Sequence, residues 1–381
     1  MRILHVTDAY LPKQGGIEVQ VHDLAVRQLL AGHEVAVMTC APAEEPDPPG
    51  GEDRPSGPRV HRVRTPWGRI RRTNTMIYEH YRRERPDVVH VHLSVLSPLA
   101  ILAVRAAARA GVPVLATLHS LWWWATPLYW IADKLIHWSA WRVHWSAVSR
   151  LAADPLQLVL RRRSEVTILP NGVEPTAWAV EPVERDPSEV VVVSVMRLAA
   201  RKRPRALLTV VRKARARLPH GVRLKVIIVG DGPLRRKLGR DIARQGVQNQ
   251  VVLAGRLERD QIRELYRRAD IYIAPAILES FGIAALEARC AGIPVIARRQ
   301  TGIADFIRTG EHGLLTSSDS GMADALAGLA STPQVRAAMA RRNRASAPET
   351  GWADVLQRCE LAYKVAHELI TPRSRERAPQ Q

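Results

Sequence analysis

Short runs of β-branched and other apolar residues alternate along the chain with longer segments in which apolar residues recur every three or four positions. Short apolar runs are typical of strands buried on both faces of a parallel sheet. Between the first two runs, residues 18–31 follow helical spacing and stop before Gly32, a residue that ends many helices. The predicted strands are residues 3–6, 35–38, 88–91 and 114–117, then 190–195, 224–229, 251–253, 271–273 and 294–296.

This alternation occurs in two series and predicts an α/β protein with two doubly wound sheets. The length of 381 residues suits two domains of about 150–200 residues each. A proline-rich stretch of mixed charge separates the two series, and a second one is expected to be an exposed loop at residues 41–58. We expect an N-terminal domain (1–174), a linker (175–189), a C-terminal domain (190–350) and a helix (351–371) that packs back toward the first domain.

The charge balance narrows the choice of partners. Lysine and arginine number 56 against 37 acidic residues, a formal net charge of +19, which favours nucleic acid, an anionic membrane surface or phosphorylated substrates. The three cysteines are widely spaced, which argues against a disulfide framework and against a zinc ribbon. The best apolar stretch, residues 93–104, is interrupted by Pro98 and is shorter than the ~20 residues that span a bilayer. We expect a cytoplasmic protein that is soluble or sits on a membrane surface.

Cations follow the first strand of the second series. Residues 197–217 hold nine arginines and lysines and no acidic residue. Arg197 and Lys202 come just after the strand, and the carboxyl ends of strands face the ligand crevice of a doubly wound sheet. A guanidinium fork and a compact ammonium together suit a diphosphate. The remaining cations of this stretch are explained by a solvated helix face.

Two carboxylates and a helix start follow the strand at residues 271–273. Glu279 is expected in the loop after this strand, and Glu287 near the second turn of the next helix. The first amides of a helix have no internal partner and bind anions. Phosphates would take these amides and the cations, and hydroxyls of ribose and sugar would take the carboxylates, so the pattern predicts a nucleotide-sugar site. The helix-start amides belong to Gly282, Ile283 and Ala284.

The first series contributes a paired glycine. Gly15 and Gly16 stand between the first strand and the helix that follows it, where the backbone can approach a phosphate, although such a pair is also common in purely structural turns. The G-x-G-x-x-G fingerprint of dinucleotide enzymes is missing, which disfavours hydride transfer.

Eight motifs taken together resemble the retaining glycosyltransferases of family 4. They occur in order over nearly the whole chain, and the family has the GT-B fold of two Rossmann-like domains facing across a cleft. The motifs are Gly15-Gly16, Thr117-Leu118-His119, Val148-Ser149, Pro170-Asn171-Gly172-Val173, Arg197-Leu198 with Arg201-Lys202, Gly230-Asp231-Gly232-Pro233, Gly255-Arg256-Leu257, and Glu279-Ser280-Phe281-Gly282 through Glu287-Ala288.

The resemblance implies a role for most of these positions. The paired glycine would lie against the donor phosphate, and Arg256, which follows the strand at 251–253, would lie beside the base. No metal and no cofactor besides the sugar nucleotide is expected. The chain departs from the family where Ser120 follows the histidine and where Arg203-Pro204 follows the lysine. The roles implied for the other residues are His119 near the transferred sugar, Arg197 and Lys202 on the diphosphate, Glu279 on sugar hydroxyls and Glu287 on the ribose.

Tryptophan is concentrated in one segment. Seven of the ten tryptophans lie within residues 122–145, and Trp138, Trp141 and Trp145 have the spacing of one helical face. Indole favours membrane interfaces and sugar rings, and it also fills cores, so both interpretations stay open. Nine arginines between residues 59 and 85 add a second basic surface to the same domain. Contact with an anionic membrane or a lipid-linked acceptor is a hypothesis that combines both features.

The sequence therefore predicts an enzyme that moves a hexosyl group, of mannose or glucose type, from a nucleoside-diphosphate sugar to an acceptor with retention of configuration. A lipid-linked or cell-envelope acceptor and a peripheral position on the inner face of the plasma membrane are part of this expectation. Two alternatives stay open: a nucleotide-sugar epimerase of the same fold, and a basic nucleic-acid-binding protein, although no recognised nucleic-acid motif occurs.

Overall fold

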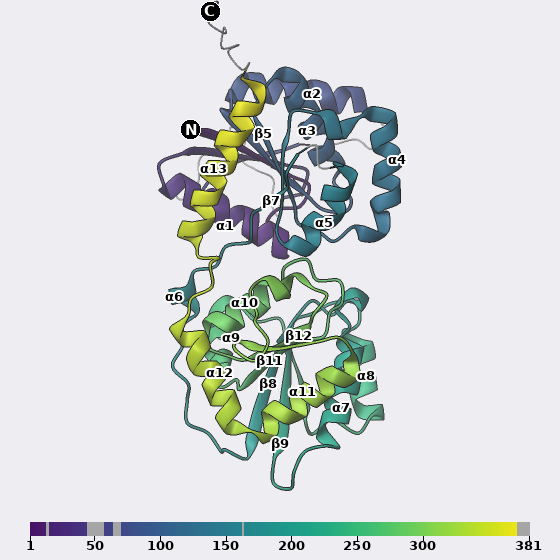
Figure 1. The fold of residues 1–381 in the computed structure, drawn as a ribbon, viewed down its shortest axis with the longest axis vertical. Coiled ribbons are helices and arrows are strands. Elements are labelled where there is room, and N and C mark those ends of the chain that lie inside the picture. The colour runs from purple at the N-terminus through teal and green to yellow at the C-terminus, as the bar shows by residue number, and fades with distance from the viewer. Residues whose placement is uncertain (13–14, 44–56, 64–69, 162–163, 372–381) are drawn as a thin grey trace, which may run out of the picture. The chain divides into compact units, whose positions relative to one another are not determined.

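The computed structural model describes residues 1–12, 15–43, 57–63, 70–161 and 164–371. It divides the chain into two compact units, Met1–Gly172 with Trp352–Gln381, and Val173–Gly351 (Figure 1). Most of the segment expected to be an exposed loop, residues 41–58, falls outside the described residues. None of the described helices is long and apolar enough to cross a membrane.

The first unit is built on a seven-stranded parallel sheet in the order β3-β2-β1-β4-β5-β6-β7. The order reverses between β1 and β4, which makes this pair the switch point of a doubly wound sheet. The strands are β1 (Arg2–Thr7), β2 (Glu34–Thr39), β3 (Arg59–Arg62), β4 (Val88–Leu93), β5 (Val114–Leu118), β6 (His144–Ala147) and β7 (Thr167–Ile168).

Helices of the first unit cover the sheet, and the last of them comes from the far end of the chain. Trp352 and Tyr363 of this C-terminal helix are buried in one apolar cluster with Leu24, Leu115 and Leu169. The helices are α1 (Gly16–Leu30), α2 (Ile70–Glu84), α3 (Pro98–Ala110), α4 (Thr126–Ile136), α5 (Arg150–Val159) and α13 (Trp352–Ile370), with 3₁₀ turns at Trp123–Ala125 and Trp138–Ala140.

The second unit repeats the plan with a six-stranded parallel sheet in the order β10-β9-β8-β11-β12-β13. Its strands are β8 (Glu189–Val195), β9 (Arg223–Val229), β10 (Val251–Gly255), β11 (Ile271–Ala274), β12 (Val295–Arg298) and β13 (Gly313–Thr316). Its helices are α6 (Pro175–Trp178), α7 (Pro204–Arg215), α8 (Arg235–Arg244), α9 (Arg259–Tyr266), α10 (Ile283–Cys290), α11 (Asp319–Ser331) and α12 (Pro333–Ala345), with 3₁₀ turns at Ala200–Lys202 and Gly302–Asp305.

The prediction of two doubly wound α/β sheets is confirmed, and each predicted strand is present. Four strands were not predicted: β3, β6, β7 and β13, all short and all near a sheet edge. Residues 175–189, which we expected to be a linker, lie in the second unit. There Trp178 is buried and packs against Tyr266, and the amide of Val183 donates to the carbonyl of Arg267.

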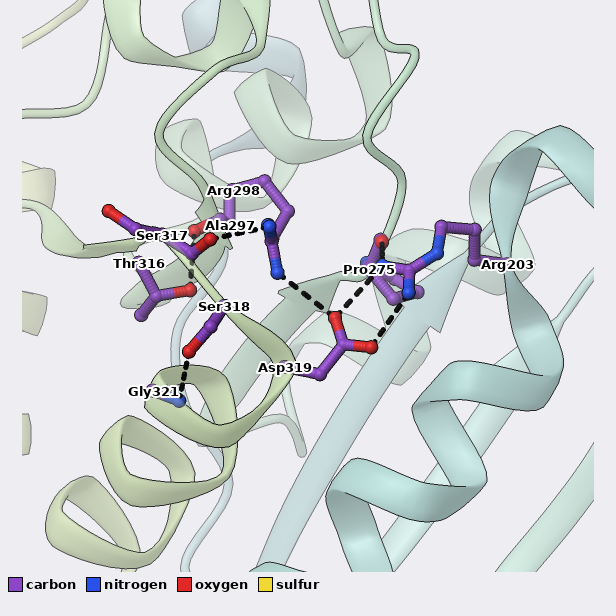
Figure 2. A network of polar contacts seen from close by, with 9 residues as sticks. All are labelled: Arg203, Pro275, Ala297, Arg298, Thr316, Ser317, Ser318, Asp319 and Gly321. Atoms are coloured by element: carbon purple, nitrogen blue, oxygen red, sulfur yellow. Dashed lines mark hydrogen bonds and ion pairs between the residues drawn. The ribbon is translucent and has the colours of Figure 1, made fainter.

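The turn that begins α7 is tied to the start of α11 by a network of polar contacts (Figure 2). Arg203, with a left-handed φ of 57°, places Pro204 at the first position of α7. Its guanidinium forms two hydrogen bonds with the Asp319 carboxylate, at 2.9 and 2.7 Å, and Arg298 donates a third at 3.0 Å. Ser318 caps α11 by accepting from the amide of Gly321. Arg203-Pro204, where the chain departs from the family pattern, thus begins α7 and links it to α11.

This network predicts a stability defect in the Asp319→Asn variant. We expect a loss of about 1–2 kcal/mol, below the ~3 kcal/mol possible for buried charged hydrogen bonds, because the Asp319 side chain is 32% exposed. The hydrogen bond from Arg203 lowers the pKa of Asp319. The contribution of the Asp319 carboxylate to the free energy of unfolding is therefore complete above the pKa of aspartate in the unfolded chain, about 3.9. This contribution is lost as the pH falls through the lower pKa of the folded state.

Calorimetric melting at pH 7 and at pH 3 tests this prediction. The matched control is Asp324→Asn, because Asp324 pairs with Arg217 at 3.1 Å with both side chains largely exposed. The control should change stability by less than about 0.5 kcal/mol. A destabilisation of Asp319→Asn at pH 7 no larger than that of the control would contradict the structural role of the network.

Candidate functional site

In the second unit, two loops meet at the point where the strand order reverses. β8 and β11 are neighbours in the sheet although β9 and β10 lie between them in the sequence. The loop after β8 carries Arg197 and Lys202, and the loop after β11 carries Glu279. Both leave the carboxyl edge of the sheet, where doubly wound folds bind ligands.

The structure brings Lys202 and Glu279 into direct contact. Nζ of Lys202 donates to Oε2 of Glu279, across 77 positions of sequence. The two side chains are 20% and 17% exposed, so the pair is partly shielded from water yet accessible to a ligand. A lysine paired in this way keeps a positive charge and two further N–H donors, which suits a phosphate oxygen.

Glu287 lies on the second turn of α10, the helix that follows the loop of Glu279. The link is Tyr272 of β11, whose hydroxyl donates to the carbonyl of Val195. Burial is the main cause that raises the pKa of Tyr272, and the negative charges of Glu279 and Glu287 add to it. The charges of both carboxylates therefore act on the same tyrosine.

The start of α10 is held in the geometry needed for anion binding. Gly282, its N-cap, has a left-handed φ of 93°, and a Cβ at this position would lie 2.5 Å from Cγ1 of Ile303. Only glycine fits both conditions without strain. Within the described residues, no hydrogen-bond partner is found for the amides of Gly282, Ile283 and Ala284. These amides and the helix dipole can accept an anion.

Two further predicted residues are exposed on the second unit. Arg197 is exposed, and no ion pair engages its guanidinium in the part of the chain that is described. Arg256 follows β10, is 57% exposed at its side chain, and lies 3.6 Å from a carboxylate oxygen of Glu258. Neither is brought into contact with Lys202, so their predicted roles depend on a bound ligand.

In the first unit, the paired glycine stands where it was expected. Gly15 is the N-cap of α1 and Gly16 its first residue. The carboxylate of Glu18 folds back to the place where a Cβ on residue 15 would stand, and its side chain is buried. This helix start is thus partly occupied by a carboxylate of its own first turn.

His119 follows β5 directly, and its amide donates to the carbonyl of Leu93. The side chain is only 8% exposed, and burial lowers its pKa to about 4. Nε2 of His119 lies 3.0 Å from Nδ1 of His92. The ring is therefore neutral at pH 7 and acts through hydrogen bonds, because it is too weak a base to accept a proton readily.

A group of buried histidines beside His119 was missed by the sequence reasoning. Ring nitrogens of His5, His90 and His92 lie within 4.8 Å of one another, the one such metal-sized group among the described residues. Each of these nitrogens already has a hydrogen-bond partner, so the group is accounted for without a metal. The sequence signal was present: His90 and His92 alternate on one buried strand and so share a face.

The prediction that Trp138, Trp141 and Trp145 share a helical face is wrong. Trp138 begins a 3₁₀ turn and Trp145 lies on strand β6. Their rings pack edge to face with centroids 5.1 Å apart, and both are buried. The spacing of three and four residues arose from a turn followed by a strand.

The exposed apolar side chains of this segment belong instead to α4 and to the residues just before it. The helix α4 lies at one side of the first unit (Figure 1). Between α4 and α5 is a groove of about 520 Å³ lined mainly by apolar side chains, among them Pro127, Trp130 and Leu158. Lys134 is the one exposed charged residue of α4, and its Nζ lies 3.6 Å from the centroid of the Trp130 ring. We call the following set the α4 patch: Trp123 (59% exposed), Trp124 (57%), Leu128 (66%), Trp130 (39%), Ile131 (51%), Leu135 (76%) and Ile136 (48%).

Two family models match the chain, one for each half. Residues 14–177 match the model described as Glycosyltransferase Family 4, and residues 179–346 match the model of glycosyl transferases group 1. Together they cover most of both units but not α13.

Two characterised relatives match over most of the chain. The gpi3 subunit of phosphatidylinositol N-acetylglucosaminyltransferase from Schizosaccharomyces pombe is 27% identical over 333 residues, which are 84% of this chain and 71% of the relative. A GDP-mannose-dependent alpha-(1-6)-phosphatidylinositol monomannoside mannosyltransferase from Mycobacterium tuberculosis is 27% identical in an alignment that covers 86% of this chain and 89% of the relative.

The fold is also that of a solved structure with a nucleotide bound. Anabaena HepE in complex with UDP and glucose superposes with a TM-score of 0.72 at 18% identity, over 96% of this chain and 99% of that one. At this level of identity the likeness concerns the fold.

Proposed function

Because the chain belongs to the glycosyltransferases of group 1 and family 4, which have the GT-B fold, we propose that it transfers a hexosyl group from a nucleoside-diphosphate sugar with retention of configuration. The observation that carries the proposal is the Lys202–Glu279 pair, with the Glu279 side chain next to Gly282 at the start of α10, where the first amides have no hydrogen-bond partner among the described residues. A diphosphate takes the cation and the amides, and sugar hydroxyls take the carboxylate. Glu287 binds the ribose, and Arg256 lies beside the base.

The proposed chemistry needs charge stabilisation more than a nucleophile. The bond from the anomeric carbon to the diphosphate oxygen breaks while the acceptor oxygen bonds to the same face of that carbon. The acceptor proton passes to the departing phosphate oxygen. Arg197, Lys202 and the α10 amides stabilise the charge that develops on this phosphate, so no metal is part of the proposal. His119 lies against the transferred sugar, and the paired glycine at α1 against the phosphate.

The acceptor in this proposal is a lipid-linked polyol of the phosphatidylinositol kind. The two relatives named above act, by their names, on phosphatidylinositol and on a phosphatidylinositol monomannoside. The α4 patch supports the same class of acceptor, because seven large apolar side chains on and before α4 are exposed, with cationic Lys134 among them and Arg161 near Trp130. Indole and aliphatic side chains beside cations suit an anionic membrane surface. The enzyme then works as a peripheral protein on the inner face of the plasma membrane.

Ligand-induced stabilisation identifies the donor. We expect one of UDP-glucose, UDP-N-acetylglucosamine, GDP-mannose and ADP-glucose to raise the melting temperature, since a ligand at 100 times its Kd stabilises by about 2.7 kcal/mol. With that donor and phosphatidylinositol-containing vesicles, the anomeric configuration of the product, read by NMR, tests retention.

Three outcomes would overturn parts of the proposal. Conversion of the donor to an isomer without any acceptor product would favour an epimerase. Inversion at the anomeric carbon would refute the proposed displacement. Absence of any thermal shift with all four donors would refute the donor site, and tight salt-sensitive retention on DNA would then favour the nucleic-acid hypothesis.

A further inference from the structure

A continuous series of hydrogen bonds crosses the interior of the first unit and ends at His119. It joins side chains from four strands and two helices, and every member is buried. It begins at the backbone carbonyl of Ala116 on β5. Its members, in order, are Ser146, Thr117, His90, Tyr363, Gln28, His5, His92 and His119.

The carbonyl end sets the direction of the protons. A carbonyl only accepts, so Oγ of Ser146, 3.4 Å from the Ala116 oxygen, donates to it. The Ser146 oxygen then accepts from the hydroxyl of Thr117 at 2.7 Å, and Thr117 accepts from Nε2 of His90 at 2.8 Å. A neutral imidazole has one N–H, so Nδ1 of His90 is an acceptor.

In the middle of the series, Tyr363 and the side-chain amide of Gln28 keep the same order of donor and acceptor. The hydroxyl of Tyr363 donates to Nδ1 of His90 at 2.9 Å and accepts from Nε2 of Gln28 at 2.8 Å. The amide oxygen of Gln28 is then the atom that faces Nε2 of His5, at 2.7 Å. This orientation of the amide is the one found in the structure, and it makes Nε2 of His5 a donor.

The last two bonds carry the direction to His119. Nδ1 of His5 accepts from Nε2 of His92 at 2.9 Å, and Nδ1 of His92 accepts from Nε2 of His119 at 3.0 Å. Burial lowers the pKa of His5 and His119 to about 4, and those of His90 and His92 well below their ordinary value. All four rings are therefore neutral at pH 7, as this order requires.

We propose that this series fixes His119 as the Nε2–H tautomer, so that its Nδ1 presents a lone pair. Among the described residues no partner is found for that nitrogen. Combined with the proposed function, on which this step rests, His119 accepts a hydrogen bond from a hydroxyl of the transferred sugar and does not donate a proton to the leaving phosphate. Tyr363 and Gln28, on helices at opposite ends of the chain, are positioning residues for His119.

Long-range ¹H–¹⁵N NMR of protein labelled with [¹⁵N]histidine tests the tautomer directly. At pH 7 we expect His119, assigned by the loss of its signals in His119→Gln, to show a protonated Nε2 and an imine-type Nδ1. The opposite tautomer, a cation or a rapid mixture would overturn the proposal. This measurement requires no donor, so it stands or falls independently of the proposed transfer reaction.

Tyr363→Phe interrupts the series, because it removes the hydroxyl between His90 and Gln28. The Gln28 amide is then free to turn, and we expect His119 to become a mixture of tautomers. With whichever of UDP-glucose, UDP-N-acetylglucosamine, GDP-mannose and ADP-glucose is hydrolysed, we expect kcat to fall about 10-fold with KM nearly unchanged. This is a smaller effect than the ~100-fold typical of deleting a group that contacts the transition state.

The matched control is Tyr81→Phe, since Tyr81 is buried in the same unit and its hydroxyl donates to a backbone carbonyl outside the series. It should lose similar stability while the His119 spectrum and kcat stay as in the wild type. A Tyr363→Phe variant that melts like Tyr81→Phe yet keeps a single Nε2–H tautomer would refute the positioning role. If Tyr363→Phe does not fold, Ser146→Ala takes its place, because it removes the link to the Ala116 carbonyl. The same His119 spectrum and kcat are measured, with the same expected result.

Discussion

Replacing Lys202 with methionine should lower kcat for transfer by about 10²–10³-fold, the range typical of deleting one donor that stabilises developing negative charge. Methionine keeps the aliphatic stem and removes only the charge. The ammonium contacts Glu279, whose side chain lies next to Gly282 at the start of α10, so the departing diphosphate of the proposed reaction would lose this cation. Melting should change little, because both members of the pair remain partly accessible to water.

Arg212→Ala is the control for a general charge effect. Arg212 is exposed on α7, so replacing it removes one positive charge from the same unit without changing a residue of the site. Its kcat should stay within about 3-fold of the wild type, or less than 1 kcal/mol in barrier height. Wild-type kcat in Lys202→Met with an accepted donor would show that the site is wrongly placed.

The contact between Lys202 and Glu279 also predicts that their effects are coupled. Glu279→Gln should lower kcat more than nucleotide affinity, because its partner in the proposal is the sugar that becomes positively charged. In the double variant the two losses should be less than additive, since each single change already disrupts the pair. Glu287→Gln should instead weaken binding of the free nucleoside diphosphate, measured by calorimetric titration.

Introducing two glutamates on the α4 patch, at Ile131 and Leu135, should abolish most vesicle binding. The two positions are four apart on α4, so they share a face, and they are 51% and 76% exposed. If both side chains insert into the membrane, losing their contacts with lipid weakens binding by about 3 kcal/mol, or roughly 100-fold in the partition coefficient. Sedimentation with vesicles containing anionic lipid measures this, and the melting temperature should remain unchanged because neither side chain is buried.

The same substitution at Leu30 and Leu361 is the matched control. Both are exposed leucines of the first unit, on α1 and α13, and lie outside the α4 patch. This variant should bind vesicles like the wild type, and both double variants should hydrolyse the donor at the wild-type rate. Raising the salt should weaken only the contribution of cations such as Lys134, since the Debye length is about 8 Å at physiological ionic strength. Equal binding by both double variants would refute the membrane role of the patch.

The sequence alone was sufficient for the fold class and for the loops that form the site in the second unit. Strands such as β1, β8 and β11 are continuous apolar runs, because parallel strands are buried on both faces, and such runs are legible without a structure. Arg197, Lys202 and Glu279 lie in the segments that follow β8 and β11, so their place at the carboxyl edge follows from topology. The edge strands β3 and β7 escaped prediction because they are short and half-buried and lack that run.

Tertiary structure decided which side chains meet and which remain exposed. Local spacing could not distinguish a helical face from a turn followed by a strand, so Trp138 and Trp145 were wrongly placed on one helix. Local spacing also could not predict that most apolar side chains of α4 remain exposed in the described part of the chain. The pairing of Lys202 with Glu279 depends on two strands that are neighbours only in the sheet. The series of hydrogen bonds that ends at His119 depends on strand register and on Tyr363 of the C-terminal helix, 273 positions from His90. Such contacts arise from the packing of distant segments, and local sequence patterns carry no record of that packing.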